Sequence, residues 1–222
     1  NCSGFSSLYI SDNIENISDY AFYECNGING SLILSTKIKR IGDYSFYNCG
    51  FNGILSMSDN LVEIGHFAFY NCSGFNGNLT IPKNITNIGE SAFYNCSGFR
   101  GNLIIPDSIT QICNKTFFNC SGFDGKLLLP ESIMSIGEFS FFNCNGLTGE
   151  LHFPSILNLT VGRYAFYNCS NFTGLLNITY NNITEGTFAY CTGFTSLLLC
   201  NKRDSLSLSL SLSLSLCVCV CV

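Results

Sequence analysis

The sequence predicts a repeat solenoid, mainly β, built of about eight coils of about 24 residues each. Three observations carry this prediction. A cysteine recurs every 22 to 25 residues between Cys2 and Cys191, and from Cys25 onward a phenylalanine stands three residues before each one. Most coils also contain a short alternation of apolar and variable residues, which is typical of a strand. A unit of this size cannot bury its apolar side chains alone, so each coil must stack on its neighbours.

Residues 72–95, CSGFNGNLTIPKNITNIGESAFYN, show the elements of one coil. In the L-x-I-P segment, Leu79 and Ile81 alternate with variable residues, which predicts a short strand with one face buried. Pro82 ends this strand, because proline cannot donate to a ladder. Stacking of the coils then places the equivalent strands side by side in a parallel sheet.

The rest of the coil returns through an I-x-x-I-G segment, whose two isoleucines point inward. Residues 90–95, ESAFYN, predict one short helical turn that drives Phe93 into the core. We expect positive φ angles at the glycines of the corners, Gly74 and Gly77 and their equivalents.

The recurring cysteines predict buried thiols that fill a narrow corner of the coil. One cysteine per coil places them in a line, whereas a structural zinc site needs four ligands around one point. Neighbouring coils about 4.8 Å apart would permit a disulfide by distance, but parallel Cβ vectors disfavour its dihedral angle. A redox or metal role is the alternative. The ladder cysteines are Cys2, Cys25, Cys49, Cys72, Cys96, Cys120, Cys144, Cys169 and Cys191.

Composition narrows the class of protein. Only 11% of the residues are charged, against roughly 25% in an ordinary globular protein, while 46% are hydrophobic, enough for a buried core. The few lysines and arginines do not cluster, so the chain lacks the electrostatic footprint of a nucleic-acid-binding protein. No stretch resembles a signal peptide and the chain starts at Asn1 inside a repeat, so we interpret it as a fragment. Nothing in the sequence calls for a cofactor.

The position six residues before each ladder cysteine is mostly acidic. We interpret these side chains as complementing the N-terminus of the helical turn. The alternative is a calcium or paired-carboxylate site of a carbohydrate-active enzyme, in which turnover would depend on Glu90 and Glu138. His66, Asn114 and Arg163 interrupt the row and favour the first interpretation. The row consists of Asp19, Asp43, His66, Glu90, Asn114, Glu138, Arg163 and Glu185.

The outward positions of the predicted strands differ from coil to coil, whereas the inward positions do not. Apolar residues stand at some of them: Ile33, Ile104, Leu128 and Leu198. An exposed apolar strip with polar surroundings predicts a binding surface, although single exposed aliphatic side chains on a sheet are also ordinary. The candidate binding residues are Asn78, Thr80, Asn102, Ile104, Lys126, Leu128, Glu150 and His152.

Sequons of the form N-x-[ST] are frequent and could carry sugar in a secreted protein. Several belong to the N-C-S phrase of the repeat, so duplication of one motif raises their number. We expect the asparagine before each ladder cysteine to bond to backbone in the corner instead. The sequons begin at Asn1, Asn16, Asn29, Asn71, Asn78, Asn84, Asn95, Asn114, Asn119, Asn158, Asn168, Asn171, Asn177 and Asn182.

The composition divides the chain into two parts. Residues 1–200 form the solenoid, with a truncated first coil, and residues 201–222 form a low-complexity tail that we expect to be disordered or artefactual. Its serine–leucine and cysteine–valine alternations are what CT and TG dinucleotide repeats encode, so we interpret the tail as translation through a microsatellite. An extra strand at the sheet edge and a membrane anchor are the alternatives, and serine at every second position disfavours a lipid-spanning helix.

The string L-x-I-P-x-x-I-x-x-I-G-x-x-A-F-x-x-C, as in residues 79–96, resembles the BspA-like, or Treponema-pallidum-type, leucine-rich repeat. The resemblance covers residues 1 to about 199 in eight consecutive copies. It implies a leucine-rich repeat solenoid in a surface or secreted protein, and adhesion to host matrix, host cells or other microbes. Cys113 departs from the pattern by replacing the glycine of I-G, and the last two coils lose the proline.

Together these observations predict a non-catalytic binding protein, extracellular or on the cell surface, whose partner is a protein or glycan on a host or microbial surface. Nucleic acid is not an expected partner, and contact with a membrane is expected only through a region missing from this fragment. Two alternatives stay open: a carbohydrate-active solenoid enzyme that uses the acidic row, and a gene fragment without selected function.

Overall fold

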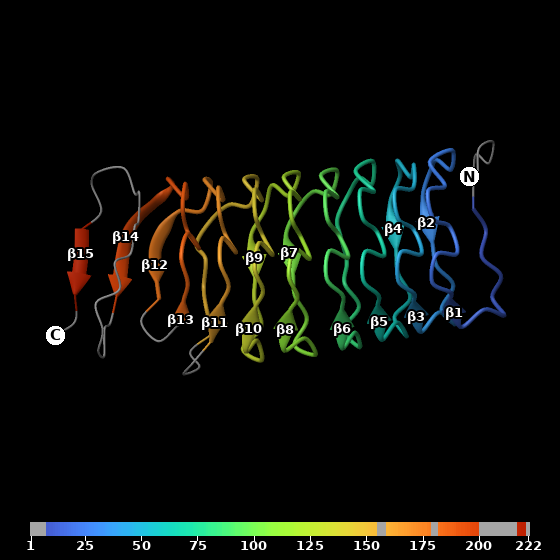
Figure 1. Cartoon of the computed structure of the whole chain (residues 1–222), viewed down its shortest axis with the longest axis horizontal. Coiled ribbons are helices and arrows are strands. Elements are labelled where there is room, and N and C mark those ends of the chain that lie inside the picture. The colour runs from blue at the N-terminus through green and yellow to red at the C-terminus, as the bar shows by residue number, and fades with distance from the viewer. Residues whose placement is uncertain (1–7, 155–158, 179–181, 200–216, 221–222) are drawn as a thin grey trace.

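The structure, a computed structural model, describes residues 8–154, 159–178, 182–199 and 217–220. Stacked coils form one elongated body that runs from the first coils at one end to the last at the other (Figure 1). The predicted solenoid is confirmed. One row contains eight strands, one from each coil. The coils form a solenoid of about seven turns. The described residues contain no helix.

Two rows of short parallel strands run along the body (Figure 1). The first row comes from the predicted L-x-I segments. It consists of β2 (Leu32–Ile33), β4 (Leu55–Ser56), β7 (Leu103–Ile104), β9 (Leu127–Leu128), β12 (Gly174–Asn177) and β14 (Phe194–Leu199). The predicted parallel sheet is divided into three, β2–β4, β7–β9 and β12–β14–β15. Between them lie the single bridges Asn78↔Arg100 and Gly149↔Phe172.

The second row lies where the sequence predicted inward isoleucines but no strand. It consists of β1 (Asn16–Ile17), β3 (Arg40–Ile41), β5 (Glu63–Ile64), β6 (Asn87–Ile88), β8 (Gln111–Ile112), β10 (Ser135–Ile136), β11 (Thr160–Val161) and β13 (Asn182–Ile183). They form two parallel sheets of four strands each. Ile41, Ile64 and Ile88 are partners in register and are buried. A strand of two residues offers too little alternation to be recognised in a sequence.

The prediction of a helical turn before each ladder cysteine is wrong. The segment is instead a run of tight turns in which Tyr70 N donates to Phe67 O over 3.2 Å. Phe67 and Asn71 have φ angles of 54° and 59°, in the left-handed region that a right-handed helix cannot contain. Phe69 N donates to Ala92 O of the next coil over 2.8 Å. Since alternate N–H groups bond between coils, they are not free for the bonds of an α-helix.

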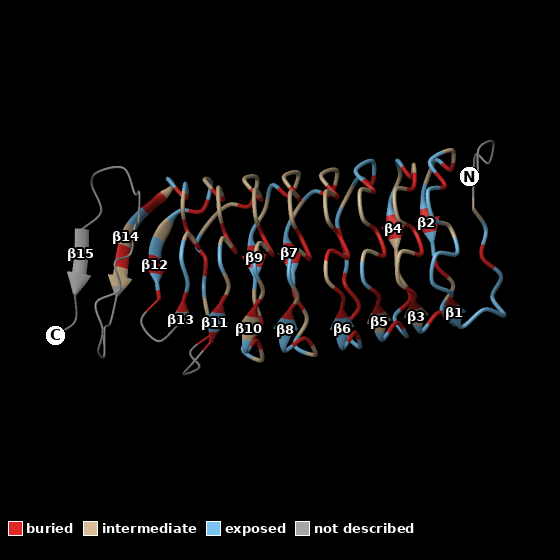
Figure 2. Ribbon diagram, in the orientation of Figure 1, coloured by how far each residue is buried: buried red, intermediate tan, exposed pale blue. Residues whose placement is uncertain are grey.

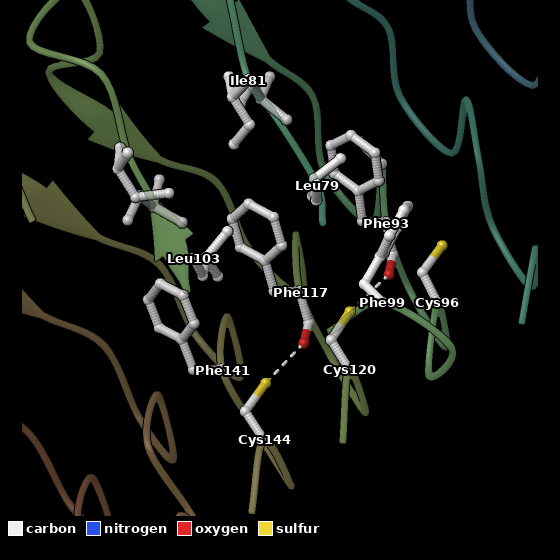
Figure 3. Close-up of a cluster of buried hydrophobic side chains, with 14 of the residues drawn as sticks. Leu79, Ile81, Phe93, Cys96, Phe99, Leu103, Phe117, Cys120, Phe141 and Cys144 are labelled. Atoms are coloured by element: carbon white, nitrogen blue, oxygen red, sulfur yellow. Dashed lines mark hydrogen bonds between the residues drawn. The ribbon is translucent and has the colours of Figure 1, made fainter. Parts of the chain in front are cut away.

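Buried segments recur along the whole body (Figure 2). Buried phenylalanines form the core and stack from coil to coil (Figure 3). Phe93 and Phe117 are parallel, with ring centroids 5.6 Å apart and an interplanar angle of 1°. A second column meets the first edge-on, since Phe99 lies 6.3 Å from Phe93 at 75°. All three rings are fully buried. Leu79 and Leu103 of the first strand row point toward the same columns (Figure 3), as the predicted inward positions require.

The corner glycines serve two different purposes. Gly77 has a φ of +73°, as predicted. Gly74 does not have a positive φ, contrary to the prediction. A Cβ there would lie 2.4 Å from the Phe51 carbonyl oxygen of the preceding coil, so the close approach of two coils excludes a side chain.

Part of the predicted tail is described. Residues Cys217–Val220 form β15, which pairs in parallel with β14 through the register Leu198↔Cys219. The rest of the predicted tail lies outside the described residues. The boundary between the solenoid and the tail stays a prediction.

Candidate functional site

All eight candidate binding residues are exposed on the first strand row or directly beside it. Ile104 on β7 and Leu128 on β9 are direct partners in the parallel register. Their side chains are 52% and 43% exposed, although both are apolar. Because partner residues of a parallel pair stand side by side, the two side chains form one apolar spot on the face.

Polar candidates stand on the same row, and some of them are held by bonds between or within coils. Asn102 Oδ1 accepts a hydrogen bond from Lys126 N over 2.7 Å. Glu150 Oε2 and His152 Nε2 lie 3.2 Å apart, an ion pair when the imidazole is protonated. These two residues stand two apart in the sequence and therefore on one face. Thr80 and Asn78 are exposed in the coil before β7.

The apolar strip is longer than the sequence analysis recognised. Ile33 is 62% exposed, as expected, and Leu198 is partly buried. Ile54 and Leu175 were missed and are 48% and 43% exposed. Ile54 stands 24 residues before Asn78, at the equivalent position of the preceding coil, so the repeat spacing already contained this signal. We call the outward side of β2, β4, β7, β9, β12 and β14 the strand-row surface.

The acidic row does not cap helical turns, because the turns are not helical. Instead, a side chain of one coil accepts a hydrogen bond from the backbone of the next coil. Asp43 Oδ1 accepts from His66 N over 2.8 Å, and His66 Nδ1 accepts in turn from Glu90 N over 3.0 Å. Asn114 Oδ1 accepts from the backbone N–H at the next row position over 2.8 Å. A carboxylate, an imidazole nitrogen and an amide oxygen serve equally well here, which explains why the row tolerates different residues.

The two carboxylates on which the enzyme alternative depends, Glu90 and Glu138, belong to this row. The backbone N–H of Glu90 donates to His66, and the backbone N–H of Glu138 donates to Asn114. Further along the row, Arg163 and Glu185 form an ion pair of 3.1 Å. Among the described residues, no group of three or more His, Cys, Asp and Glu side chains could hold a metal ion.

The ladder thiols from Cys49 to Cys191 are buried, as predicted, and each donates to a carbonyl oxygen of the preceding coil. Cys2 lies outside the described residues. Cys120 Sγ donates to Phe93 O and Cys144 Sγ donates to Phe117 O, both over 3.0 Å (Figure 3). Burial raises the pKa of Cys144 to about 12. The thiols therefore stay protonated, whereas a nucleophile or a zinc ligand needs the thiolate.

Two cysteines depart from this pattern. Cys25 is disulfide-bonded, contrary to the prediction for the ladder cysteines. Cys113 takes the place of a corner glycine, is partly buried, and its pKa is raised by burial and by the nearby Glu90 carboxylate.

The prediction that the asparagine before a ladder cysteine bonds to backbone is wrong. From Asn48 to Asn168, these asparagines bond to the asparagines at the same position of neighbouring coils. Asn95 Nδ2 donates to Asn71 Oδ1 over 2.5 Å, and Asn119 Nδ2 donates to Asn95 Oδ1 over 2.6 Å. The ladder runs from Asn48 to Asn168. Its sequons are partly buried, whereas Asn84 and Asn171 stand on exposed positions. The sequons at Asn1 and Asn158 lie outside the described residues.

Within the described residues there is no helix long and apolar enough to cross a membrane.

Comparisons with known proteins agree with this architecture. The structure resembles a leucine-rich repeat protein from Bacteroides ovatus, with a TM-score of 0.62, 21% identity, and coverage of 87% of this chain and 55% of that chain. The chain thus spans about half the length of that protein. A leucine rich cell surface protein from Faecalibacterium prausnitzii gives a TM-score of 0.49 and 20% identity, with coverage of 87% and 68%. A comparison with curated proteins found no match.

The sequence matches the family described as BspA type leucine rich repeat region, in six copies, over residues 1–124 and 125–211. This match covers nearly the whole chain and agrees with the repeat string and the stacked coils. The chain therefore belongs to the BspA-type leucine-rich repeat family.

Proposed function

We propose that the protein is a non-catalytic binding protein of the cell surface or extracellular space, and that it adheres to a protein or glycan of a host or microbial surface through its strand-row surface. The observation that carries the proposal is the contrast between the two sides of the first strand row. The inward leucines are uniform and buried, while the outward residues vary from coil to coil and are exposed.

The apolar spot of Ile104 and Leu128 supports the strand-row surface as the place of contact. Exposed aliphatic side chains that touch each other and have polar neighbours are typical of interaction sites. Lys126, Glu150 and His152 supply charged or polar groups nearby in the sequence and along the row. A surface that extends over many coils suits a long ligand better than a small molecule in a pocket.

A cell-surface or extracellular location is part of the proposal. It rests on family membership and on the frequent sequons of the sequence. Sugar attached at exposed sequons such as Asn84 or Asn171 would be compatible with it, since both lie away from the Asn48–Asn168 ladder.

The test is a binding assay of the full chain on immobilised mucins, extracellular-matrix proteins and a glycan array. We expect at least one of these surfaces to retain the protein, and the double variant Ile104→Ser, Leu128→Ser to lose at least tenfold in affinity. The matched control is Val62→Ser with Met134→Ser, two exposed apolar residues that directly precede β5 and β10 of the second strand row. No retention on any surface, or an equal loss in the control, would contradict the proposal.

The non-catalytic part is tested separately on a panel of polysaccharides. We expect no turnover, because Asn114 holds the row position between Glu90 and Glu138, so these two carboxylates do not stand in neighbouring coils. Turnover that disappears in Glu90→Gln and Glu138→Gln would overturn this part of the proposal in favour of an enzyme.

A further inference from the structure

A second surface lies on the turns that precede the first few ladder cysteines, where two columns of aromatic rings run side by side. In one column, Tyr20, Tyr44 and Phe67 stack with centroid distances of 4.9 and 4.7 Å. In the other, Tyr23, Tyr47 and Tyr70 stack at 4.9 and 4.7 Å. Tyr44 and Tyr47 join the columns, with centroids 5.8 Å apart and planes tilted by 41°. We call these six rings the aromatic patch.

The coil does not need a ring in the first of these columns. Ser91 and Lys115 occupy the same position in the next two coils, with φ angles of 56° and 54°. Tyr44 and Phe67 have nearly the same φ, 53° and 54°, although a bulky side chain in the left-handed region costs about 1 kcal/mol. The rings of the first column are therefore an addition that the backbone geometry does not explain.

Stacking leaves part of each ring face free of its neighbouring ring. Tyr20 and Tyr23 are exposed, and the other four rings of the patch are partly buried. The rings of the first column are parallel within 3° to 9°, yet their centroids are farther apart than the contact distance of about 3.5 Å between stacked planes. Neighbouring rings must therefore be shifted sideways by roughly 3 Å, in an offset-stacked arrangement. Tyr20, at the start of the column, is 57% exposed. The face of an aromatic ring carries negative potential and attracts cations.

Carboxylates stand beside the rings. Burial and then the charge of Glu24 raise the pKa of Tyr23. Burial, the neighbouring tyrosines and the carboxylates of Asp43 and Glu90 raise the pKa of Tyr44. Glu24 directly follows Tyr23 and Asp43 directly precedes Tyr44 in the chain, and Glu90 O accepts a hydrogen bond from Phe67 N over 2.9 Å. The three acids therefore border the patch and give it a negative rim.

The nearest cation is already engaged. Arg40 lies 3.2 Å from Asp19 and 3.3 Å from Glu63. The rim acids Glu24, Asp43 and Glu90 are not among its ion-pair partners within 4 Å in the described part of the chain.

The same column shows, farther along, how a cation fits. The guanidinium of Arg163 lies 5.5 Å from the ring centroid of Tyr164, which occupies the position of Tyr44 in its coil. Arg163 also pairs with Glu185 of the next coil at 3.1 Å. At this place the chain itself supplies the ring, the guanidinium and, from the next coil, the carboxylate. At the aromatic patch the position of Arg163 is held by Asp43, so the chain supplies rings and carboxylates, and the guanidinium has to come from elsewhere.

We propose that the aromatic patch binds an arginine-rich extended peptide segment of a partner protein, with guanidinium groups over the ring faces and paired with Glu24, Asp43 or Glu90. A planar guanidinium fits this site better than an ammonium group, because it stacks on a ring and bonds to a carboxylate at the same time. This surface is distinct from the strand-row surface and does not depend on the function proposed for it.

The test uses the full chain and two fluorescein-labelled peptides, one of alternating arginine and glycine and one of alternating serine and glycine, in fluorescence anisotropy. We expect the arginine peptide to bind at least tenfold more tightly, and its affinity to fall several-fold between about 50 and about 300 mM sodium chloride. Equal affinity for the two peptides would overturn the proposal.

Variants locate the site. Tyr20→Ser with Tyr44→Ser copies the serine that the fold accepts at Ser91, and we expect at least a tenfold loss of affinity for the arginine peptide. The matched control is Phe139→Ser, at the same position of the repeat but outside the patch, for which we expect no change. An equal effect of both variants would overturn the location.

A second pair of variants covers the case that the serine variant is unfolded in circular dichroism. Glu24→Gln with Glu90→Gln leaves every ring in place. We expect about a fivefold loss of affinity and a weaker dependence on salt. Unchanged affinity in this variant would overturn the role of the negative rim and, with it, the choice of a cationic partner.

Discussion

At the scale of single residues, the repeat selects side chains that fit between two coils as well as within one. A thiol in the corner of a coil donates to a phenylalanine carbonyl of the preceding coil. A glycine before the acidic row has no Cβ because the preceding coil fills that space. Cysteine, glycine and asparagine recur because each one solves a contact that exists only after stacking.

The thiol ladder makes stability sensitive to alkaline pH. The ordinary pKa of a cysteine is 9.0, and burial raises the pKa of Cys144 to about 12. Above about pH 9 the unfolded chain therefore loses this proton while the folded chain retains it, so the free energy of unfolding falls as the pH rises. Between about pH 9 and pH 10 the loss from one such thiol is about 1 kcal/mol.

The measurement is urea unfolding of the parent chain and of Cys144→Ala at several pH values. We expect Cys144→Ala to be less stable at neutral pH by about 1 kcal/mol, since a buried hydrogen bond is lost. Its stability should then decline less steeply above about pH 9. Partly buried tyrosines such as Tyr70, whose pKa is also raised, contribute to the slope in both proteins, and the comparison removes their part. Identical slopes would contradict the raised pKa.

Gly65 and Gly30 are glycines for different reasons. Gly65 has no space for a side chain, whereas Gly30 has space but a positive φ. A Cβ on Gly65 would lie 2.6 Å from Asp43 N and 2.7 Å from Gly42 C, both backbone atoms. A Cβ on Gly30 would meet nothing within 4 Å, but its φ is +79°. We expect Gly65→Ala to lower the free energy of unfolding by roughly 3 kcal/mol and Gly30→Ala by about 1 kcal/mol. Chemical denaturation measures both, and equal losses would show that backbone conformation alone decides.

At the scale of elements, rows of hydrogen bonds between equivalent residues hold neighbouring coils together, as the bonds between long strands do in an ordinary sheet. Most strands of the two rows are only two residues long. Elsewhere in the coil, neighbouring coils are joined by backbone bonds of the turn residues and by the asparagine amides from Asn48 to Asn168. The turn and its amide are therefore structural elements in their own right, although neither has a regular backbone.

The amide ladder is tested at Asn95, which donates to Asn71 and accepts from Asn119. Asn95→Ala removes both bonds and leaves an alanine at a φ of 56°, so we expect a loss of about 3 kcal/mol in unfolding free energy. Asn95→Gly removes the bonds but suits the positive φ, and we expect about 2 kcal/mol. Thermal and urea unfolding compare the two variants. A glycine variant as stable as the parent would show that the amides contribute nothing.

Particular residues show how far the sequence reaches. Leu79, Ile81 and Phe93 are buried as their spacing predicts, because burial repeats with the period of the coil. The left-handed turns were not predictable, since Tyr44 and Phe67 have no preference for positive φ and take it up only because neighbouring coils bond to their backbones.

The candidate site divides in the same way. Exposure of Ile104 and Leu128 follows from alternation along a strand and was predicted. The bonds of the acidic row and of the asparagines join residues about 24 positions apart, and the choice between backbone and side-chain partners depends on distances between coils that the sequence does not contain.

At the scale of the whole molecule, each coil is stabilised by its neighbours, and the hydrophobic core extends along the body from coil to coil. Deleting Ser97–Cys120 removes one coil and joins Cys96 to Ser121, which restores the C-S-G-F phrase and all ladders. We expect this variant to fold, with a dependence on denaturant reduced by about one eighth, in proportion to the buried surface. Deleting residues 97–108, half a coil, shifts every ladder out of register, and we expect loss of cooperative unfolding. A folded half-coil variant would contradict this one-dimensional design.

The ladders also have a direction, because thiols and amides always donate toward the earlier coil. A cut between any two coils would expose donors on the later side and their acceptors on the earlier side. The two faces of such a cut are complementary and not alike. Two copies of the body could therefore match only head to tail, which generates an open filament and not a closed, symmetric pair. Coils can therefore be added to the repeat one at a time without changing the contacts between the coils already present.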